Sequence, residues 1–253
     1  MFRRTPADPT TADCAPESGG SAPNLVPVQS EAIDYWSTGQ SDRILNFKDK
    51  VGMRARRKIF MEFTRAIRPD GSARVLDVGV TPQQRFTSDN LFEELYEPKD
   101  RITATSIEDA SFLEKKYPGL RFIQTDGSSL PFADNEFDVV FSSAVIEHVG
   151  DIDRQREFLA ELLRVGRQFF VTTPNRWFPV ELHTTLPFIH WLPRPLHQKL
   201  LRSMGKEFWA STENLNLLSA SEFLALFPAD VSPSLIRLHT AGFTSNLLVH
   251  GWS

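Results

Sequence analysis

The chain has 253 residues, with 28 lysines and arginines against 32 aspartates and glutamates, so its formal net charge is −4. This balance gives no electrostatic reason to expect nucleic-acid binding. Hydrophobic residues make up 41% of the chain, enough for a globular core, and no run of about 18 apolar residues predicts a membrane span. Cys14 is the only cysteine. It excludes an internal disulfide framework and a cysteine-based zinc site, and it fits a reducing compartment, expected here to be the cytoplasm.

Residues 1–30 are predicted to form a disordered leader. They combine prolines with Thr, Ala, Ser and Gly, and they offer too little apolar surface to offset the entropy of ordering. Residues 31–253 are expected to form a single domain. The prolines of the leader are Pro6, Pro9, Pro16, Pro23 and Pro27.

A long helix is predicted between Ile44 and Ile67, where apolar residues recur at steps of three and four before Pro69. Its opposite face is basic. A solvated surface explains that face most simply; the alternative is a patch for an anionic substrate or a membrane surface, which leaves peripheral membrane contact open. The basic residues are Lys48, Lys50, Arg54, Arg56, Arg57, Lys58, Arg65 and Arg68.

After the turn at residues 69–71, strand patterns alternate with helix patterns. This alternation is typical of an α/β fold: a Rossmann-like, doubly wound and mostly parallel sheet with helices on both faces. The run FDVVF is apolar enough for a strand buried on both faces. Strands are predicted at residues 73–78, 101–107, 120–124, 137–142 and 168–172, and helices at 88–96, 110–117 and 154–164.

The alternation stops at residue 174. Residues 174–195 are dense in proline and aromatic residues, and helices are predicted at 196–204 and 220–227. We therefore expect an inserted helical and aromatic lid at about residues 174–230. Two β-like runs, at 234–239 and 245–252, flank the sequence TAGFT and predict a C-terminal antiparallel hairpin at the sheet edge.

Polar residues follow several of the predicted strands. In an open parallel sheet, ligands bind beyond the carboxyl ends of the strands. Carboxylates recur after three successive strands, which suits a cofactor with hydroxyl groups, amines and a positive charge. The candidate cofactor contacts are Asp77, Gly79, Thr81, Ser106, Glu108, Asp126, Gly127, Ser142 and Ser143.

Four stretches together resemble a known family. VLDVG, RITATSIED, RFIQTDGSSLPFADNEFDVVFSSAVIEHV and LLRVGRQFFVTTPNR are similar to class I S-adenosylmethionine-dependent methyltransferases of the small-molecule methyltransferase-domain type. The resemblance covers about residues 73–176, and the third stretch is its most specific part. It implies an enzyme that uses S-adenosylmethionine and transfers the methyl group by in-line displacement.

The resemblance also implies roles for single residues. Asp77 and Gly79 match the motif that faces the methionine part of the cofactor, where a carboxylate suits two cationic groups. Asp126 matches the residue that meets the adenine amino group, with Gly127 beside it. Ser142 and Ser143 follow the strand whose backbone approaches the methionine moiety.

Two positions depart from the family pattern. The family's loop has glycine where this chain has Thr81 and Gln83, so we expect a reshaped loop. The absent G-x-G-x-x-G spacing also argues against a dinucleotide cofactor. The acid that grips the ribose aligns with Ser106; Glu108 is the nearest carboxylate, and it either contacts the ribose or caps the following helix. These departures motivate an alternative function, a degenerate fold serving as a non-catalytic binding or scaffold module.

His148 is the best-placed candidate for a catalytic base, which a hydroxyl acceptor would require. The alternative is a structural role or one in the cofactor shell, because EHV accompanies different substrates in this family.

The sequence TPNRWFPVELHTTLPFIHWLP, residues 173–193, lies where the family often builds its acceptor lid. Its aromatic residues either pack a small subdomain or line an acceptor pocket. No metal is predicted, because Glu181, His183 and His190 lack a convincing ligand spacing. A small-molecule or lipid- or sugar-linked acceptor is predicted, with no nucleic acid; the oligomeric state is left open. The candidate acceptor contacts are Arg176, Trp177, Glu181 and His183.

Overall fold

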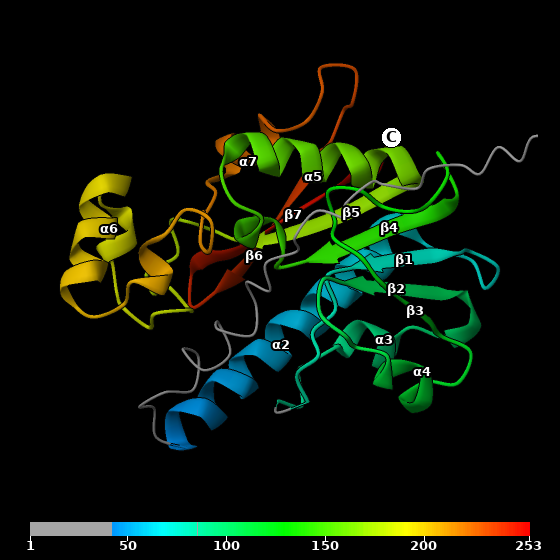
Figure 1. Ribbon diagram of the computed structural model, residues 1–253, viewed down its shortest axis with the longest axis horizontal. Coiled ribbons are helices and arrows are strands. Elements are labelled where there is room, and N and C mark those ends of the chain that lie inside the picture. Colours follow the sequence, from blue (N-terminus) through cyan, green and yellow to red (C-terminus); the bar gives the residue numbers. More distant parts are fainter. Residues whose placement is uncertain (1–41, 85) are drawn as a thin grey trace, which may run out of the picture.

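The computed structural model describes residues 42–84 and 86–253, so the predicted leader at 1–30 lies outside the described residues. In this part of the chain, seven strands form one sheet in the order β3-β2-β1-β4-β5-β7-β6 (Figure 1). Strands β1 to β5 are parallel, and β7 pairs antiparallel with both β5 and β6. The strands are β1 (Val75–Val78), β2 (Ile102–Ser106), β3 (Arg121–Gln124), β4 (Phe137–Ser143), β5 (Gly166–Pro174), β6 (Ser234–Thr240) and β7 (Phe243–Trp252).

Helices cover both faces of the sheet, as a doubly wound fold requires (Figure 1). The face drawn below the sheet carries α2 (Asp42–Ile67), α3 (Leu91–Leu95) and α4 (Phe112–Lys116). The face drawn above it carries α5 (Ile152–Val165) and α7 (Ala220–Leu224). The Rossmann-like prediction is therefore confirmed. Within residues 42–84 and 86–253, no helix has the length and apolar character needed to cross a membrane.

An aromatic cluster fixes α2 against the sheet. Phe63 is fully buried, and its ring meets those of Phe92, Phe141 and Phe170 edge-on, with centroids 5.2, 5.5 and 5.5 Å away. Edge-to-face contacts at these distances are favourable beyond the area they bury. From Ile59 to Ile67, the predicted apolar stripe of the long helix is thus the face that α2 presents to the core, with Ile59, Phe63 and Ile67 buried.

The C-terminal hairpin is confirmed, with a tighter turn than the five residues TAGFT suggest. Strands β6 and β7 extend to Thr240 and Phe243, so only Ala241 and Gly242 remain between them. Both have positive φ, 52° and 84°, the backbone that two-residue hairpin turns favour. Within the hairpin, β6 forms the edge of the sheet and β7 lies inside it.

Between β5 and α7 the chain leaves the sheet and returns to it, forming what we call the inserted segment (residues 175–218). Its two ends meet in a parallel bridge between Asn175 and Leu218. The segment carries α6 (Arg194–Ser203) and a small core of its own. The inserted segment ends before α7, which packs into the same core as α5. The lid at about residues 174–230 stays a prediction. The buried residues of the segment's small core are Leu201, Trp209, Ala210, Leu215 and Leu217.

Candidate functional site

The carboxyl ends of β1, β2 and β3 lie side by side. Parallel pairing aligns the ends of these strands, and hydrogen bonds continue past them. The Gly79 amide donates to the Thr105 carbonyl at 2.8 Å, and the Thr125 amide donates to the Ser106 carbonyl at 2.9 Å. The residues that follow these strands therefore share one edge of the sheet, where ligands of such folds bind.

The two serines at the end of β4 use their side chains within the protein. The Ser142 hydroxyl donates to the Val78 carbonyl of β1 at 2.9 Å, and the Ser143 hydroxyl lies 2.9 Å from that of Thr172. Their hydroxyls thus tie β4 to its neighbours on both sides. A role toward a cofactor falls to their backbone.

The loop after β1 is held by an asparagine in place of the glycines expected at Thr81 and Gln83. The Thr81 amide donates to Asn90 Oδ1 at 2.9 Å, and Asn90 Nδ2 donates to the Thr81 carbonyl at 2.8 Å. Asn90 adopts a left-handed backbone with φ of 51°, which asparagine tolerates well. For this reason α3 begins at Leu91, and the helix start predicted at residue 88 is wrong.

Asp77 lies next to a second buried acid, Glu93 of α3. Burial, and then the neighbouring charge of Glu93, raise the pKa of Asp77 well above its usual value. Burial also raises the pKa of Glu93. Burial makes both acids resist ionisation. A cationic ligand beside them would favour their ionised forms. Glu93 could not be singled out from the sequence, because the run FEEL contains two adjacent glutamates and nothing in it distinguishes the buried one.

The pair predicts a specific pH dependence. Both acids have raised pKa values in the folded protein, so the folded state binds more protons and stability falls as pH rises from the ordinary values of 3.8 and 4.5. We expect Glu93→Gln to be more stable than the wild type at pH 7 and to lose less stability between pH 4 and 7, as measured by urea unfolding. The exposed neighbour supplies a control, Glu94→Gln, which should keep the wild-type profile. A Glu93→Gln variant less stable than wild type at pH 7 would contradict the inference that the two buried acids destabilise the folded protein at that pH.

Glu108 does not cap the helix after β2. In its place, Asp109 accepts a hydrogen bond from the Ser111 amide at 2.9 Å, and α4 has no side-chain cap. Glu108 Oε2 is buried and has no hydrogen-bond partner among the described residues, and burial raises the pKa of its carboxyl. A buried acceptor without a partner is costly, so this oxygen suits a ligand hydroxyl.

Asp126 shapes the turn after β3. Its Oδ1 accepts hydrogen bonds from the amides of Ser128 and Ser129, at 2.9 and 3.0 Å. The adjacent Gly127 leaves no room for a side chain, since a Cβ there would lie 2.3 Å from the Phe158 ring. The turn is therefore set by both residues, and a ligand at this edge would meet its outer side.

His148 lies in the short helix η2 (Ile146–His148) after β4, and both of its ring nitrogens have partners. Nδ1 lies 2.7 Å from the Asn214 carbonyl oxygen, and Nε2 lies 3.1 Å from His183 Nε2. His183 Nδ1 in turn lies 2.5 Å from Glu181 Oε1. His148 could accept a proton from a substrate only after the contact with His183 opens, so its role as a base stays a prediction.

The charges around this histidine pair are unusual. Burial raises the pKa of Glu147 to about 7 and lowers the pKa of His148 to about 3. Burial works to raise the pKa of Glu181, but pairing with His183 and hydrogen bonds from His183 and Thr184 outweigh it and lower that pKa to about 2. Glu181 is therefore a carboxylate. The motif EHV led to the prediction of His148 as a site residue, whereas the buried Glu147 beside it was not predicted.

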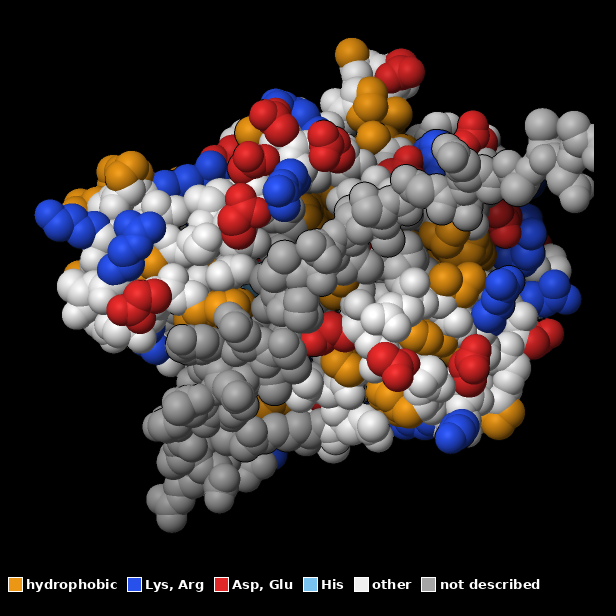
Figure 2. All heavy atoms as spheres, in the orientation of Figure 1, with side chains coloured by type: hydrophobic (Ala, Val, Ile, Leu, Met, Phe, Trp, Pro, Cys, Tyr) orange, Lys and Arg blue, Asp and Glu red, His pale blue; other side chains and the backbone are white. Residues whose placement is uncertain are grey.

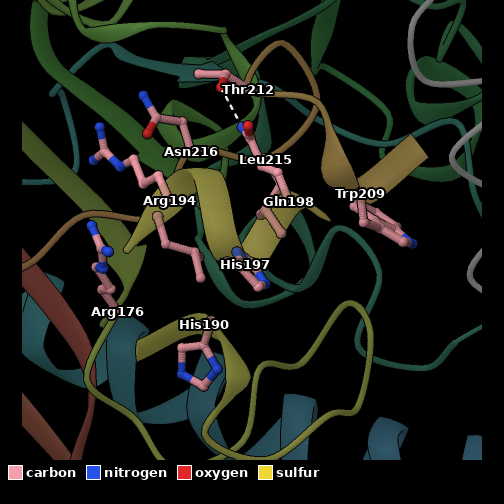
Figure 3. Close-up of a pocket in the computed structure, with 10 residues that line it drawn as sticks. Arg176, His190, Arg194, His197, Gln198, Trp209, Thr212, Leu215 and Asn216 are labelled. Carbon is pink, nitrogen blue, oxygen red and sulfur yellow. Dashed lines mark hydrogen bonds between the residues drawn. The ribbon is translucent and has the colours of Figure 1, made fainter. Parts of the chain in front are cut away.

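The four predicted acceptor contacts do not form one group. Glu181 and His183 are buried beside His148, whereas Trp177 is 50% exposed. Arg176 borders a separate cavity inside the inserted segment, together with Arg194, and both arginines pair with Glu222. Figure 3 shows these arginines with His190 and His197 around the cavity, whose volume of about 30 Å³ suits one or two water molecules but no acceptor.

Comparison with known proteins points to one family. A family model described as "Methyltransferase domain" matches residues 88–168. The ubiquinone biosynthesis O-methyltransferase of Brucella anthropi is 32% identical over 206 residues, which are 74% of this chain and 79% of that protein.

Two solved structures share the fold at low sequence identity. Magnesium protoporphyrin IX methyltransferase from Synechocystis, with bound S-adenosylhomocysteine, has a TM-score of 0.55 at 12% identity, covering 88% of this chain and 95% of that one. The 1,6-didemethyltoxoflavin-N1-methyltransferase of Burkholderia thailandensis has a TM-score of 0.53 at 14% identity, covering 91% and 92%.

Proposed function

Because this chain belongs to the class I S-adenosylmethionine-dependent methyltransferases, we propose that it methylates a hydroxyl group of a small-molecule acceptor. The choice of oxygen is supported by the similarity to an enzyme named an O-methyltransferase. The observation that carries the proposal is a set of acidic residues along one edge of the sheet, with the inserted segment following β5 at the same end. Asp77 lies near the end of β1, Glu108 follows β2 and Asp126 follows β3.

Each acid has a proposed part in holding the cofactor. We assign Asp77, which lies next to Glu93, to the cationic methionine part of the cofactor. Its positive charge would favour the ionised forms of the two buried acids. Glu108 Oε2 offers an acceptor for a ribose hydroxyl, and Asp126 offers its outer oxygen to the adenine amino group. When bound, the cofactor would supply a methyl group: its bond to sulfur breaks as the bond to the acceptor oxygen forms, S-adenosylhomocysteine leaves, and the hydroxyl gives up its proton to water. The residues of the chain hold the two reactants in line.

We further propose a lipid-linked acceptor, approached from the inserted segment. Trp177, Phe188 and Trp191 are 50%, 53% and 38% exposed, and the rings of Phe188 and Trp191 are 4.9 Å apart. Figure 2 shows Lys and Arg side chains gathered over α6, on the same segment. Aromatic rings beside basic groups suit the boundary between a lipid tail and water.

The function is tested with hydroxylated aromatic acceptors that carry or lack a prenyl tail. We expect formation of S-adenosylhomocysteine with a tailed phenol and less with its tail-free analogue, and transfer of an isotope-labelled methyl group to oxygen. Calorimetry with S-adenosylmethionine and S-adenosylhomocysteine checks the cofactor separately. Absence of binding to both would favour the scaffold alternative instead.

The adenine contact predicts an order of binding defects. Asp126→Ala removes the contact and the acceptor that holds the turn, so S-adenosylhomocysteine affinity should fall by roughly 10–100-fold, since a hydrogen bond to a charged group is worth ~1.5–3 kcal/mol. Glu108→Ala should weaken binding less. Asp109→Ala removes a comparable turn contact to Ser111 outside the proposed site and should bind normally. Calorimetry that finds Glu108→Ala weaker than Asp126→Ala would undo the assignment of the adenine contact.

A further inference from the structure

Three side chains from two distant parts of the chain converge beside the end of β4. Glu147 and His148 belong to η2, and His183 comes from the inserted segment. One ligand atom from each of the three lies within 4.8 Å of the others. Glu147 and His183 are buried and His148 is half-buried, so the group lies just below the surface.

The outer atom of each histidine ring is fixed by an acceptor. A carbonyl oxygen can only accept, so Nδ1 of His148, 2.7 Å from the Asn214 carbonyl, carries the proton and its Nε2 is the lone-pair atom. His183 Nδ1 donates to the Glu181 carboxylate at 2.5 Å. Glu181 is itself held by the amide and hydroxyl of Thr184, at 2.6 and 2.7 Å. Metal-binding histidines are oriented in this way, with the second nitrogen bound to a carbonyl or carboxylate.

The inner atoms then face one another. His148 Nε2 and His183 Nε2 are 3.1 Å apart. Two nitrogens bound to one zinc ion at ~2.0–2.1 Å and a tetrahedral angle lie roughly 3.3 Å apart, close to this value. A proton shared between the rings would also account for the short distance, but it would not account for the glutamate.

Glu147 provides the observation that separates these explanations. Its Oε2 accepts a hydrogen bond from the Thr173 hydroxyl at 3.0 Å, whereas its Oε1 is buried without a hydrogen-bond partner among the described residues. Leaving a buried carboxylate oxygen unpaired is costly. A cation between the three side chains would give this oxygen a partner within reach of both Nε2 atoms.

We propose that Glu147, His148 and His183 bind one divalent transition-metal ion through the carboxylate and the two Nε2 atoms. Two imidazoles and one carboxylate favour Zn²⁺ and similar ions over Mg²⁺, which prefers oxygen ligands. Three protein ligands would leave the fourth position of a tetrahedral ion for water or for an acceptor oxygen. The site departs from the prediction of no metal, because its ligands come from residues 147–148 and 183 and leave no short spacing in the sequence.

The test is metal binding by the full chain, without an affinity tag and with Cys14→Ser to remove the only thiol. We expect calorimetry to give one Zn²⁺ per chain and excess Mg²⁺ not to compete. His183→Gln and Glu147→Gln should each weaken Zn²⁺ binding by at least about 100-fold, since even outer partners of metal ligands are worth 10–100-fold. The matched control, His239→Gln, changes an exposed histidine of β6 and should bind Zn²⁺ as the parent does.

A second measurement does not depend on any variant folding. Co²⁺ added to the parent chain should give visible absorption bands of nitrogen- and oxygen-bound Co²⁺, and Zn²⁺ should abolish them. The proposal is overturned by absent bands, by equal competition from Mg²⁺, or by Zn²⁺ binding that His183→Gln leaves intact. The proposal does not rest on the proposed acceptor. These measurements need neither cofactor nor acceptor, so failed metal binding leaves the methyltransferase assignment standing, and failed methyl transfer leaves the metal site standing.

Discussion

Replacing Phe63 by alanine is expected to destabilise the protein by about 3–5 kcal/mol, the usual cost of removing a fully buried phenylalanine. The ring is 0% exposed and lies against Phe92 of α3, Phe141 of β4 and Phe170 of β5. Its loss would leave a cavity among rigid aromatic rings that cannot collapse into it. Urea unfolding of the full chain measures the effect.

A matched control lies on the same helix. Met61 is 59% exposed, so Met61→Ala should change the unfolding free energy by less than about 0.5 kcal/mol. A small effect of Phe63→Ala would mean that α2 is not part of the folding core. The result bears on the site as well, because Asp49 of α2 accepts hydrogen bonds from the Thr87 hydroxyl and the Ser88 amide, in the loop that leads to Asn90.

Gly79→Ala is expected to cost about 2–4 kcal/mol, combining a disfavoured backbone with overpacking. Gly79 has φ of +101°, and a Cβ there would lie 2.2 Å from a methyl carbon of Val145. Because the Gly79 amide also donates to the Thr105 carbonyl, a shift to relieve the clash would disturb the junction of β1 and β2. We therefore expect weaker binding of S-adenosylhomocysteine in addition to a lower melting temperature.

Two further variants separate the backbone strain from the overpacking in the destabilisation caused by Gly79→Ala. Gly205 also has positive φ, +68°, but a Cβ there would meet nothing within 4 Å, so Gly205→Ala measures the backbone strain alone. Adding Val145→Ala to Gly79→Ala should recover the overpacking part. Equal losses in Gly205→Ala and Gly79→Ala would show that Val145 contributes nothing.

The sequence predicted the sheet well because each strand has a local signature. FDVVF is apolar throughout and becomes β4, which has parallel neighbours on both sides. The predicted start of α3 was wrong because of a contact between residues far apart in the sequence. Asn90 leaves the helical conformation and holds Thr81, nine residues earlier. No helix propensity contains that information.

The candidate site could be predicted from the sequence where its residues lie at or just after strand ends, and not where it depends on packing. Asp77, Glu108 and Asp126 stand out because strand ends are visible in the pattern, and their contacts with a cofactor stay a prediction. Glu93 and Glu147 do not stand out, because burial is what makes them unusual and burial depends on the folded chain. The pairing of His148 with His183 links residues from separate elements, which a single sequence cannot align.

The inserted segment begins and ends at one place in the structure. Asn175 and Leu218 bridge each other, and the Arg176 amide donates to the Leu218 carbonyl at 3.0 Å. A loop whose ends already touch can change its length and content at little entropic cost to the rest of the fold. The length and content of this segment can therefore vary while the strands of the sheet keep their places.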